Sequence, residues 1–222
     1  MSIEIKNLGL QDYQSTWQAM QDFTAQRHVD TPDQIWLVEH PPVYTQGLNG
    51  QPEHIQQSLG DIPLVQSDRG GQITYHAPGQ LIVYTLIDLK RRHLGVRALV
   101  SLLENACIAQ LTELGISAQS RKDAPGIYVN SQKIASLGLK IKRQCSYHGL
   151  ALNVNMDLSP FQRITPCGLS GMQMTQVSLY NSEQTVQSLA PGLVDRIQHG
   201  LLNWPIISHH LNNEKTQPHP IR

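Results

Sequence analysis

The spacing of apolar residues along the chain predicts three helices and a series of strands. Residues 11–26 and 96–114 carry apolar side chains three and four positions apart, the period of an amphipathic helix, and Gly115 follows the second of these as a terminator. Residues 192–204 repeat this period near the end of the chain. Short apolar runs bounded by Gly, Pro or Asn indicate strands. These runs cover residues 3–8, 35–39, 43–45, 73–76, 81–86, 127–129, 133–141 and 148–154.

The order of these elements favours an α+β fold. Several predicted strands follow one another directly, and helices stand between groups of strands rather than after every strand. A doubly wound sheet would alternate strand and helix more regularly. At 222 residues, with no internal repeat or linker, the chain fits one domain. We expect that domain over residues 1–204, followed by a polar, loosely held tail over residues 205–222.

Composition and charge argue against several classes of protein. The 17 basic residues balance the 17 acidic ones, so no overall field would attract nucleic acid. The longest apolar run, near residues 81–87, is far shorter than the roughly 20 residues of a membrane span. The three cysteines are isolated, unlike those of a secreted disulfide scaffold, and the first residues lack the apolar segment of a signal peptide. We therefore expect a cytoplasmic protein that binds neither nucleic acid nor a membrane.

Common motifs for cofactors and metals are missing from the sequence. It contains no glycine-rich phosphate-binding or dinucleotide-binding motif and no serine-hydrolase G-x-S-x-G. The ten histidines form no H-E-x-x-H, and none is paired with a C-x-x-C. The sequence thus predicts neither a metal site nor a cofactor.

One of the three thiols has the setting of a nucleophile. Cys167 lies between Pro166 and Gly168, in a turn that can present a thiol and nearby N–H groups to a substrate. Cys107 falls on the apolar side of the helix predicted over residues 96–114, where a buried cysteine is common. Cys145 lies in a polar turn that suggests no task. Taken alone, a Pro-Cys-Gly turn can also be purely structural.

Strand alternation separates one lysine from its neighbours. Side chains alternate between the two faces of a strand, so Lys133 shares a face with Ala135, whereas Lys140 and Lys142 lie on the opposite, solvated face. A cation beside a thiol lowers the pKa of that thiol, so Lys133 and Cys167 would suit one another. A lysine that extends from a hairpin end towards water explains the same pattern.

A third group of candidates lies in the segment 69–76. It offers a guanidinium, a hydroxyl and an imidazole around two glycines, a combination that suits a pocket for an acyl carbonyl or a pantetheine arm. His76, on a predicted strand, is as readily explained as a hydrogen-bonded core histidine. His148, before the Gly149-Leu150-Ala151 run, has the same two explanations.

Several motifs together resemble the lipoyl(octanoyl) transferases. The order of these motifs along the chain is that seen in the family, and the similarity runs from about residue 3 to residue 204. The motifs are H-P-P-V-Y-T-Q-G at 40–47, R-G-G-Q-I-T-Y-H-A-P-G-Q at 69–80, K-I-A-S-L-G-L at 133–139, H-G-L-A-L-N-V at 148–154 and P-C-G at 166–168.

The resemblance implies a single domain with a mixed sheet and flanking helices, as in biotin and lipoate ligases. It implies transfer of octanoyl from octanoyl-acyl carrier protein to a lysine of a lipoyl domain, in E2 subunits of 2-oxoacid dehydrogenases or in the glycine cleavage H protein. By motif, Cys167 would form the acyl-thioester and Lys133 would lower its pKa, without a cofactor. Lys133 could also accept a proton from the incoming amine. The implied substrate-binding residues are Arg69, Gly70, Gly71, Gln72, Ile73, Thr74, Tyr75, His76, Ser136, Leu137, Gly138, Gly149, Leu150 and Ala151.

Two other functions remain compatible with the residues. An ATP-dependent lipoate or biotin ligase of the same fold would adenylate a free acid and would not depend on a cysteine. A non-catalytic module that binds a carrier protein would use Cys167 only for packing. Local basic groups at 90–92, 121–122 and 140–143 could steer an acidic carrier protein, or they are ordinary solvated surface.

Overall fold

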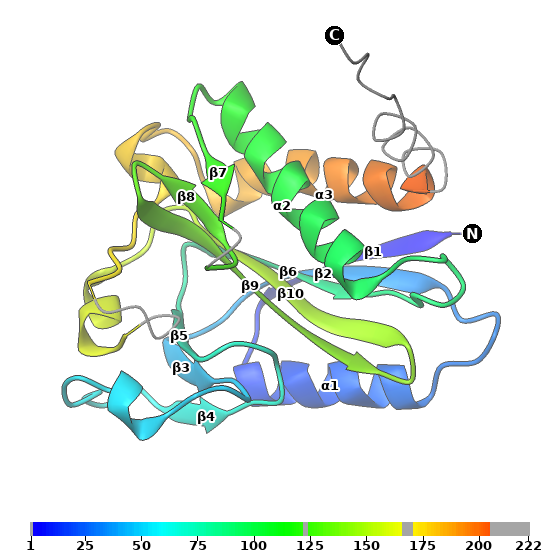
Figure 1. The fold of residues 1–222 in the computed structure, drawn as a ribbon, viewed down its shortest axis with the longest axis horizontal. Coiled ribbons are helices and arrows are strands. Elements are labelled where there is room, and N and C mark those ends of the chain that lie inside the picture. The colour runs from blue at the N-terminus through cyan, green and yellow to red at the C-terminus, as the bar shows by residue number, and fades with distance from the viewer. Residues whose placement is uncertain (1, 122–123, 166–170, 205–222) are drawn as a thin grey trace, which may run out of the picture.

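A seven-stranded mixed sheet forms the centre of the computed structural model, which describes residues 2–121, 124–165 and 171–204 (Figure 1). Its strands lie in the order β1-β2-β6-β10-β9-β8-β7. The edge strand β1 runs parallel to β2, and every other neighbouring pair is antiparallel. The strands are β1 (Ile3–Leu10), β2 (Asp33–Glu39), β6 (Gln80–Leu86), β7 (Gln119–Ser120), β8 (Ile127–Val129), β9 (Gln132–Lys142) and β10 (Cys145–Asn153).

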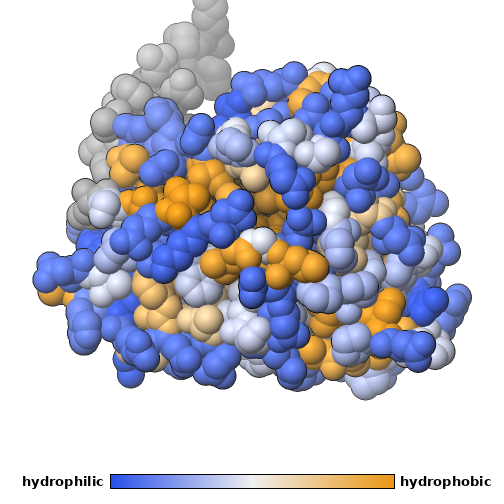
Figure 2. Space-filling view, turned by 180° about the vertical axis from the view of Figure 1, so that it is seen from behind, coloured by the Kyte–Doolittle hydropathy of each residue, from blue (hydrophilic) through white to orange (hydrophobic). Residues whose placement is uncertain are grey.

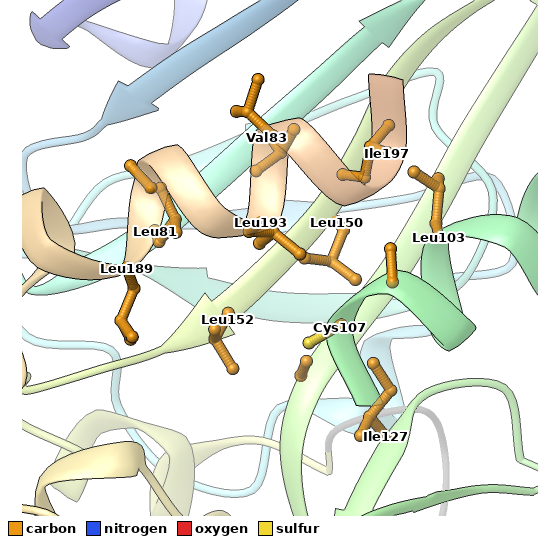
Figure 3. Packing of buried hydrophobic residues seen from close by; sticks show 14 of the residues in the cluster. Leu81, Val83, Leu103, Cys107, Ile127, Leu150, Leu152, Leu189, Leu193 and Ile197 are labelled. Atoms are coloured by element: carbon orange, nitrogen blue, oxygen red, sulfur yellow. The ribbon is translucent and has the colours of Figure 1, made fainter. Parts of the chain in front are cut away.

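Helices cover both faces of this sheet. In Figure 1, α2 (Val96–Glu113) and α3 (Val186–Leu202) lie together on one face, and α1 (Tyr13–Ala25) lies on the other. The main core fills the space beneath α2 and α3, and a smaller cluster around Met20 and Trp36 lies beneath α1. Figure 3 shows leucines of α3 packed against apolar side chains of the central strands, as an amphipathic face requires.

A second, three-stranded sheet in the order β4-β3-β5 lies on the α1 side (Figure 1). It consists of β3 (Val43–Gln46), β4 (Leu64–Gln66) and β5 (Ile73–His76). The segment 77–79 takes the chain from β5 in the small sheet to β6 in the large one. The two sheets therefore meet where the sequence predicts most of the substrate-binding residues. Short 3₁₀ turns complete the described chain: η1 (Pro52–His54), η2 (Ser159–Arg163) and η4 (Val177–Leu179).

The predicted α+β architecture, a mixed sheet with flanking helices, is confirmed, and the boundaries of two elements differ from the prediction. Helix α3 begins at Val186, six residues before the predicted start, because Thr185 and Ser188 form a capping box that begins the helix ahead of Pro191. The β8–β9 turn has two residues rather than three. Asn130 and Ser131 both adopt positive φ, at 48° and 68°, as in a type I′ hairpin turn.

A buried carboxylate joins several elements at one end of the sheet. Asp33 accepts ion pairs from Arg27 at 2.5 Å, Arg91 at 2.8 Å and Arg92 at 2.5 Å, and its side chain is fully buried. Arg92 also donates to the Leu201 carbonyl at 3.1 Å, near the end of α3. Two of the three basic residues at 90–92 are thus engaged with a buried carboxylate, Arg92 buried and Arg91 partly exposed, so neither alternative offered for this group, a steering surface or ordinary solvated surface, describes them fully.

The outer surface is mixed in character. On the face shown in Figure 2, apolar residues gather in separate patches between hydrophilic side chains. None of the helices in the described ranges combines the length and the apolar character that a bilayer crossing requires.

Replacing Asp33 by Asn tests the buried cluster. Three arginines would then lie around a neutral amide, and removing one partner of a buried ion pair costs about 3–5 kcal/mol. We expect the free energy of unfolding of Asp33→Asn, measured with urea, to fall by that amount. Asp30→Asn, at an exposed position in the turn before β2, should stay within about 0.5 kcal/mol of the wild type. An equally small change for both variants would contradict a stabilising role.

Candidate active site

A narrow pocket lies where the small sheet meets the large one. It is lined by the loop before β5, by β5 itself and by the centres of β6, β9 and β10, and its volume is about 50 Å³. Twelve of the fourteen predicted substrate-binding residues line it, all except Gly70 and Tyr75. The Tyr75 ring instead packs in the core of the small sheet against Tyr44 and Phe161. The lining residues are Tyr13, Arg69, Gly71, Gln72, Ile73, Thr74, His76, Ile82, Tyr84, Ser136, Leu137, Gly138, His148, Gly149, Leu150 and Ala151.

The loop 69–72 closes the pocket by lying directly against β9. The Gly70 N–H donates to the Leu139 carbonyl at 2.9 Å. A Cβ atom added at Gly138 would lie 3.0 Å from the Gly70 carbonyl oxygen, closer than carbon normally approaches oxygen. Backbone thus meets backbone with no side chain between, which explains a glycine on each side of the contact.

Arg69 holds this loop in shape. Its Nε and Nη2 donate to the Thr45 hydroxyl at 3.1 and 2.9 Å. Nη2 also reaches the carbonyls of Thr45 at 2.5 Å and Gln72 at 2.7 Å, and Nη1 reaches that of Gly70 at 3.1 Å. The guanidinium lines the pocket and also binds two carbonyls of its own loop and one of β3, so it holds the loop against the small sheet and shapes the wall.

A cluster of tyrosine and histidine rings forms the floor of the pocket. Tyr13 of α1 stacks on His76 of β5 with ring centroids 6.0 Å apart. His40, which follows β2, bonds through Nε2 to the Tyr84 hydroxyl at 2.8 Å and packs edge-on against both Tyr13 and His76. These rings join α1, the small sheet and the large sheet at one point.

Burial keeps this floor uncharged at neutral pH. It lowers the pKa of His40 to about 4, and burial together with the neighbouring His40 lowers the pKa of His76 to about 3. Burial likewise raises the pKa of the Tyr13 and Tyr84 hydroxyls. The floor of the pocket therefore offers neutral hydrogen-bonding groups, while the Arg69 guanidinium brings a positive charge to the lining.

One carboxylate lies behind the wall formed by β10. Asp68 accepts hydrogen bonds from His148 Nε2 at 3.0 Å, Trp17 Nε1 at 2.7 Å and Gln21 Nε2 at 3.2 Å, and a further one from the Tyr147 hydroxyl. Partial burial opposes the charge, but the bonds from His148 and Tyr147 outweigh it and lower the pKa of Asp68 below its usual range. The carboxylate is thus ionised and fixed by four donors.

Lys133 is buried, as the sequence predicts, but not for the predicted reason. A bulge in the β8–β9 ladder pairs Lys133 with Tyr128 and Ala135 with Ile127. Because neighbouring residues of β8 face opposite sides, Lys133 and Ala135 no longer share a face. The Lys133 side chain is one of the largest that are fully buried, and its Nζ lies 5.6 Å from the centre of the Tyr128 ring.

The Lys133 ammonium lies beside a different cavity. It donates to the Pro125 carbonyl at 2.9 Å, and a Cβ added at Gly126 would meet its Cε at 2.3 Å, so only glycine leaves room for it. Pro125 lines a wider groove of about 650 Å³ between α2 and β9, together with Glu104. Leu137 and Gly138 line this groove and the narrow pocket alike, so the centre of β9 is a wall between the two.

Of the three cysteines, two are placed by the structure. Cys107 lies on the inner face of α2, fully buried among apolar side chains (Figure 3), and burial raises its pKa to about 12. Cys145 is buried at the start of β10, and burial raises its pKa as well. Both therefore remain protonated at neutral pH. Cys167 lies outside the described residues, and so does its predicted contact with Lys133.

Sequence reasoning missed several residues of the site. Tyr13, Ile82 and Tyr84 line the pocket, and Asp68 holds His148 from behind. The spacing of apolar residues correctly placed Tyr13 on an apolar helix face and Ile82 and Tyr84 in a buried strand. That spacing shows which side chains are buried, but it does not show which of them border a cavity. The only cue for Asp68 is that it precedes the R-G-G motif.

The groups gathered here suit proton transfer and hydrogen bonding at the polar end of a largely apolar ligand. His148 lines the pocket with a carboxylate behind it, and glycine backbone forms two of the walls. Within the described ranges, no three His, Cys, Asp or Glu side chains gather closely enough to hold a metal ion.

Comparison with known proteins identifies close relatives by sequence. The lipoyl protein ligase A/B catalytic domain family matches residues 12–198. An octanoyltransferase from Hydrogenovibrio crunogenus is 58% identical over 203 residues, which cover 90% of this chain and 97% of that protein. An octanoyltransferase from Escherichia coli is also 58% identical, over 91% of this chain and 94% of its own length.

Solved structures share the fold at low sequence identity. A lipoate-protein ligase A bound with ATP superposes with a TM-score of 0.75 at 14% identity, covering 90% of this chain and 86% of that one. A lipoate protein ligase of Thermoplasma acidophilum, described with its E2 lipoyl domain, gives 0.67 at 13% identity, over 90% and 84%. The biotin protein ligase of Aquifex aeolicus gives 0.52 at 12% identity, over 92% and 70%.

The buried imidazoles should make folding sensitive to mild acid. His40 and His76 bind protons near pH 6.5 when unfolded but only near pH 4 and 3 when folded. Below pH 6.5 the unfolded chain therefore binds more protons, and stability falls as the pH is lowered. We expect urea denaturation to show a loss on the order of 1–3 kcal/mol per imidazole between pH 7 and 4.

The interval from pH 6.5 to 5 isolates this effect, because unfolded carboxyl groups titrate mainly below it. His40→Gln should reduce the slope of stability against pH in that interval, whereas His93→Gln, at an exposed position, should leave the slope unchanged. NMR titration provides a direct measurement. Imidazole signals of His40 and His76 that titrate near pH 6.5 in the folded protein would contradict the burial argument.

Proposed function

The chain belongs to the lipoyl protein ligase A/B catalytic domain family, and we propose that it works through a thioester. It is an acyltransferase that transfers octanoyl groups in protein lipoylation. In our proposal, Cys167 carries the octanoyl group as this thioester. The donor would be octanoyl-acyl carrier protein. The acceptor would be the lysine amine of a lipoyl domain, in a 2-oxoacid dehydrogenase E2 subunit or the glycine cleavage H protein. One observation carries the substrate-binding part of this proposal, namely that the segments 69–76, 136–138 and 149–151 converge on one pocket.

Two acyl transfers in succession would complete the reaction. In the first, the Cys167 thiol gives up its proton and the thiolate attacks the octanoyl carbonyl; a new C–S bond forms, the C–S bond to pantetheine breaks, and the departing pantetheine sulfur takes the proton that Cys167 gave up. In the second, the lysine amine attacks the same carbonyl; a C–N bond forms, the C–S bond to Cys167 breaks, and one proton of the amine passes to the Cys167 sulfur, which leaves as thiol. The first step exchanges one thioester for another and is nearly balanced in free energy, so ATP is not required. The alternate use of one nucleophile by two protein substrates implies ping-pong kinetics.

We assign Lys133 the role of favouring the Cys167 thiolate. A buried ammonium stabilises an anion nearby more strongly than an exposed one, because water does not screen it. Supporting this role, Lys133 is fully buried and held by Pro125, with Gly126 leaving space for its side chain. The parallel bridge between Lys133 and Met174 also ties β9 to the chain that follows residues 166–170.

The ATP-dependent ligases share the fold but not the close sequence relationship. At 14% identity, the superposition with a lipoate-protein ligase bound with ATP bears on the fold alone. The relatives at 58% identity over nine-tenths of the chain are octanoyltransferases. We therefore favour direct transfer from the carrier-protein thioester over adenylation of a free acid.

Substitution of Cys167 tests the thioester. After mixing with octanoyl-acyl carrier protein, the wild type should gain the mass of one octanoyl group, and Cys167→Ser should gain none, in intact-mass spectra without ATP. Cys107→Ala and Cys145→Ala are matched controls, because both thiols are buried and protonated, and both should acquire the adduct. A wild type without an adduct, or an adduct retained by Cys167→Ser, would contradict the proposal.

Substitution of Lys133 tests whether this lysine lowers the pKa of the Cys167 thiol. Without its ammonium, the Cys167 thiol should return towards the ordinary pKa of about 8.5, and the thiolate fraction at pH 7 should fall by about tenfold or more. Lys133→Met should slow adduct formation at pH 7 accordingly and recover part of the rate at pH 9. Lys142→Met, on an exposed part of the same strand, should react as the wild type does. Equal pH–rate profiles for the wild type and Lys133→Met would rule out this role.

A further inference from the structure

His148 has an unusual position within β10. Its φ of 59° places it in the left-handed region, which residues other than glycine seldom adopt within a strand. The side chain is 1% exposed, and it lines the narrow pocket. Its Nδ1 is buried and has no hydrogen-bond partner among the described residues. A strained backbone and an unsatisfied polar atom both cost free energy, and such costs concentrate at functional sites.

The partner of the other ring nitrogen fixes the tautomer. Nε2 lies 3.0 Å from Asp68, and an ionised carboxylate only accepts hydrogen bonds, so the proton of the neutral imidazole is on Nε2. Burial lowers the pKa of His148, although Asp68 opposes this shift. The ring is therefore neutral at pH 7, and Nδ1 carries a free lone pair. This is the arrangement of an imidazole oriented by a carboxylate so that it can take a proton.

The rest of the pocket also favours a ligand that donates hydrogen bonds. Oε1 of Gln72, a second lining residue, is a buried acceptor with no partner among the described residues. The Arg69 guanidinium donates hydrogen bonds to Thr45, Gly70 and Gln72. Two unsatisfied acceptors in a narrow pocket match an amine, which brings several N–H donors, better than they match a carboxylate.

We propose that the pocket receives the lysine amine of the acceptor domain and that His148, oriented by Asp68, is the base that deprotonates it. This assignment rests on the proposed acyl-transfer function and replaces Lys133 in the role of general base, since Lys133 does not line the pocket. Asp68 is a positioning residue: it fixes the tautomer and touches no substrate.

The step balances in atoms and charge. The amine nitrogen attacks the octanoyl carbonyl and a C–N bond forms, while one N–H proton of that nitrogen passes to Nδ1 of His148. The C–S bond to the thiol then breaks, and the imidazolium returns the proton to the departing sulfur. The products are the amide, the free thiol and a neutral histidine, so no other reactant is needed.

The positive φ at position 148 makes a clean experiment possible. Glycine tolerates this backbone conformation, so His148→Gly removes the ring without added strain and leaves a cavity that free imidazole can enter. The full-length enzyme is loaded from octanoyl-acyl carrier protein, freed of donor and mixed with an unmodified lipoyl domain. The rate of amide formation is then followed by intact mass. We expect transfer to slow by about 100-fold or more, loading to change by only a few fold, and added imidazole to restore part of the transfer rate.

Two further variants separate chemistry from folding. His148→Asn suits the same φ and retains a polar side chain but cannot act as a base, so it should lose transfer as His148→Gly does, without the cavity. His93→Gly is the matched control: this exposed histidine also has a positive φ, of 50°, and lies outside the pocket lining. It should load and transfer at wild-type rates.

The outcomes distinguish this inference from the thioester proposal. Transfer at the wild-type rate in both His148 variants would overturn it, and so would equal losses of loading and transfer that imidazole does not reverse. A defect confined to loading would assign His148 to donor binding instead and would also overturn it. If the wild type forms no adduct, the thioester proposal fails. Overall turnover of the same variants, with and without imidazole, then still tests the base.

Discussion

The pocket exists because the backbone of one loop lies directly on the backbone of another strand. The bond from the Gly70 N–H to the Leu139 carbonyl joins the small sheet to the large one, and the absence of a side chain at Gly138 permits the approach. Arg69 completes the joint by donating hydrogen bonds to the carbonyls of Gly70 and Gln72 in its own loop and of Thr45 on β3. A Cβ atom at Gly70 or Gly138 would lie only 3.2 or 3.0 Å from the opposite carbonyl oxygen, so a side chain at either position would strain this contact.

The electrostatic character of the site follows from the same closure. Water is excluded from the ring cluster, so His40 and His76 remain neutral, and the floor of the pocket offers hydrogen bonds rather than charge. The one carboxylate at its edge, Asp68, keeps its charge only because four donors surround it. Asp33, by contrast, is fully buried. It lies with its three arginines at the start of β2, away from the pocket, where it stabilises the fold.

Much of the fold and part of the site could be predicted from the sequence. Helical spacing located α1 and α2, and apolar runs located the central strands, because burial on one face imposes those periods. The start of α3 was missed because the capping box at Thr185 precedes a proline, and a proline inside a helix usually argues against one. Strand alternation failed at Lys133 because a bulge leaves no mark in the hydrophobic pattern. The pairing of Asp68 with His148 spans 80 residues, and no local pattern encodes such a contact.

The shared wall at the centre of β9 has a consequence for altering this protein. Leu137 and Gly138 face both the narrow pocket and the wide groove beside Pro125. Only this single strand separates the two cavities. A larger side chain at Leu137 or Gly138 that changes the shape of one cavity will therefore also disturb the other. A substitution on this wall therefore cannot be assigned to one cavity from its effect alone. A change meant for the groove alone is better placed on α2, where Val96 and Val100 border the groove but not the pocket.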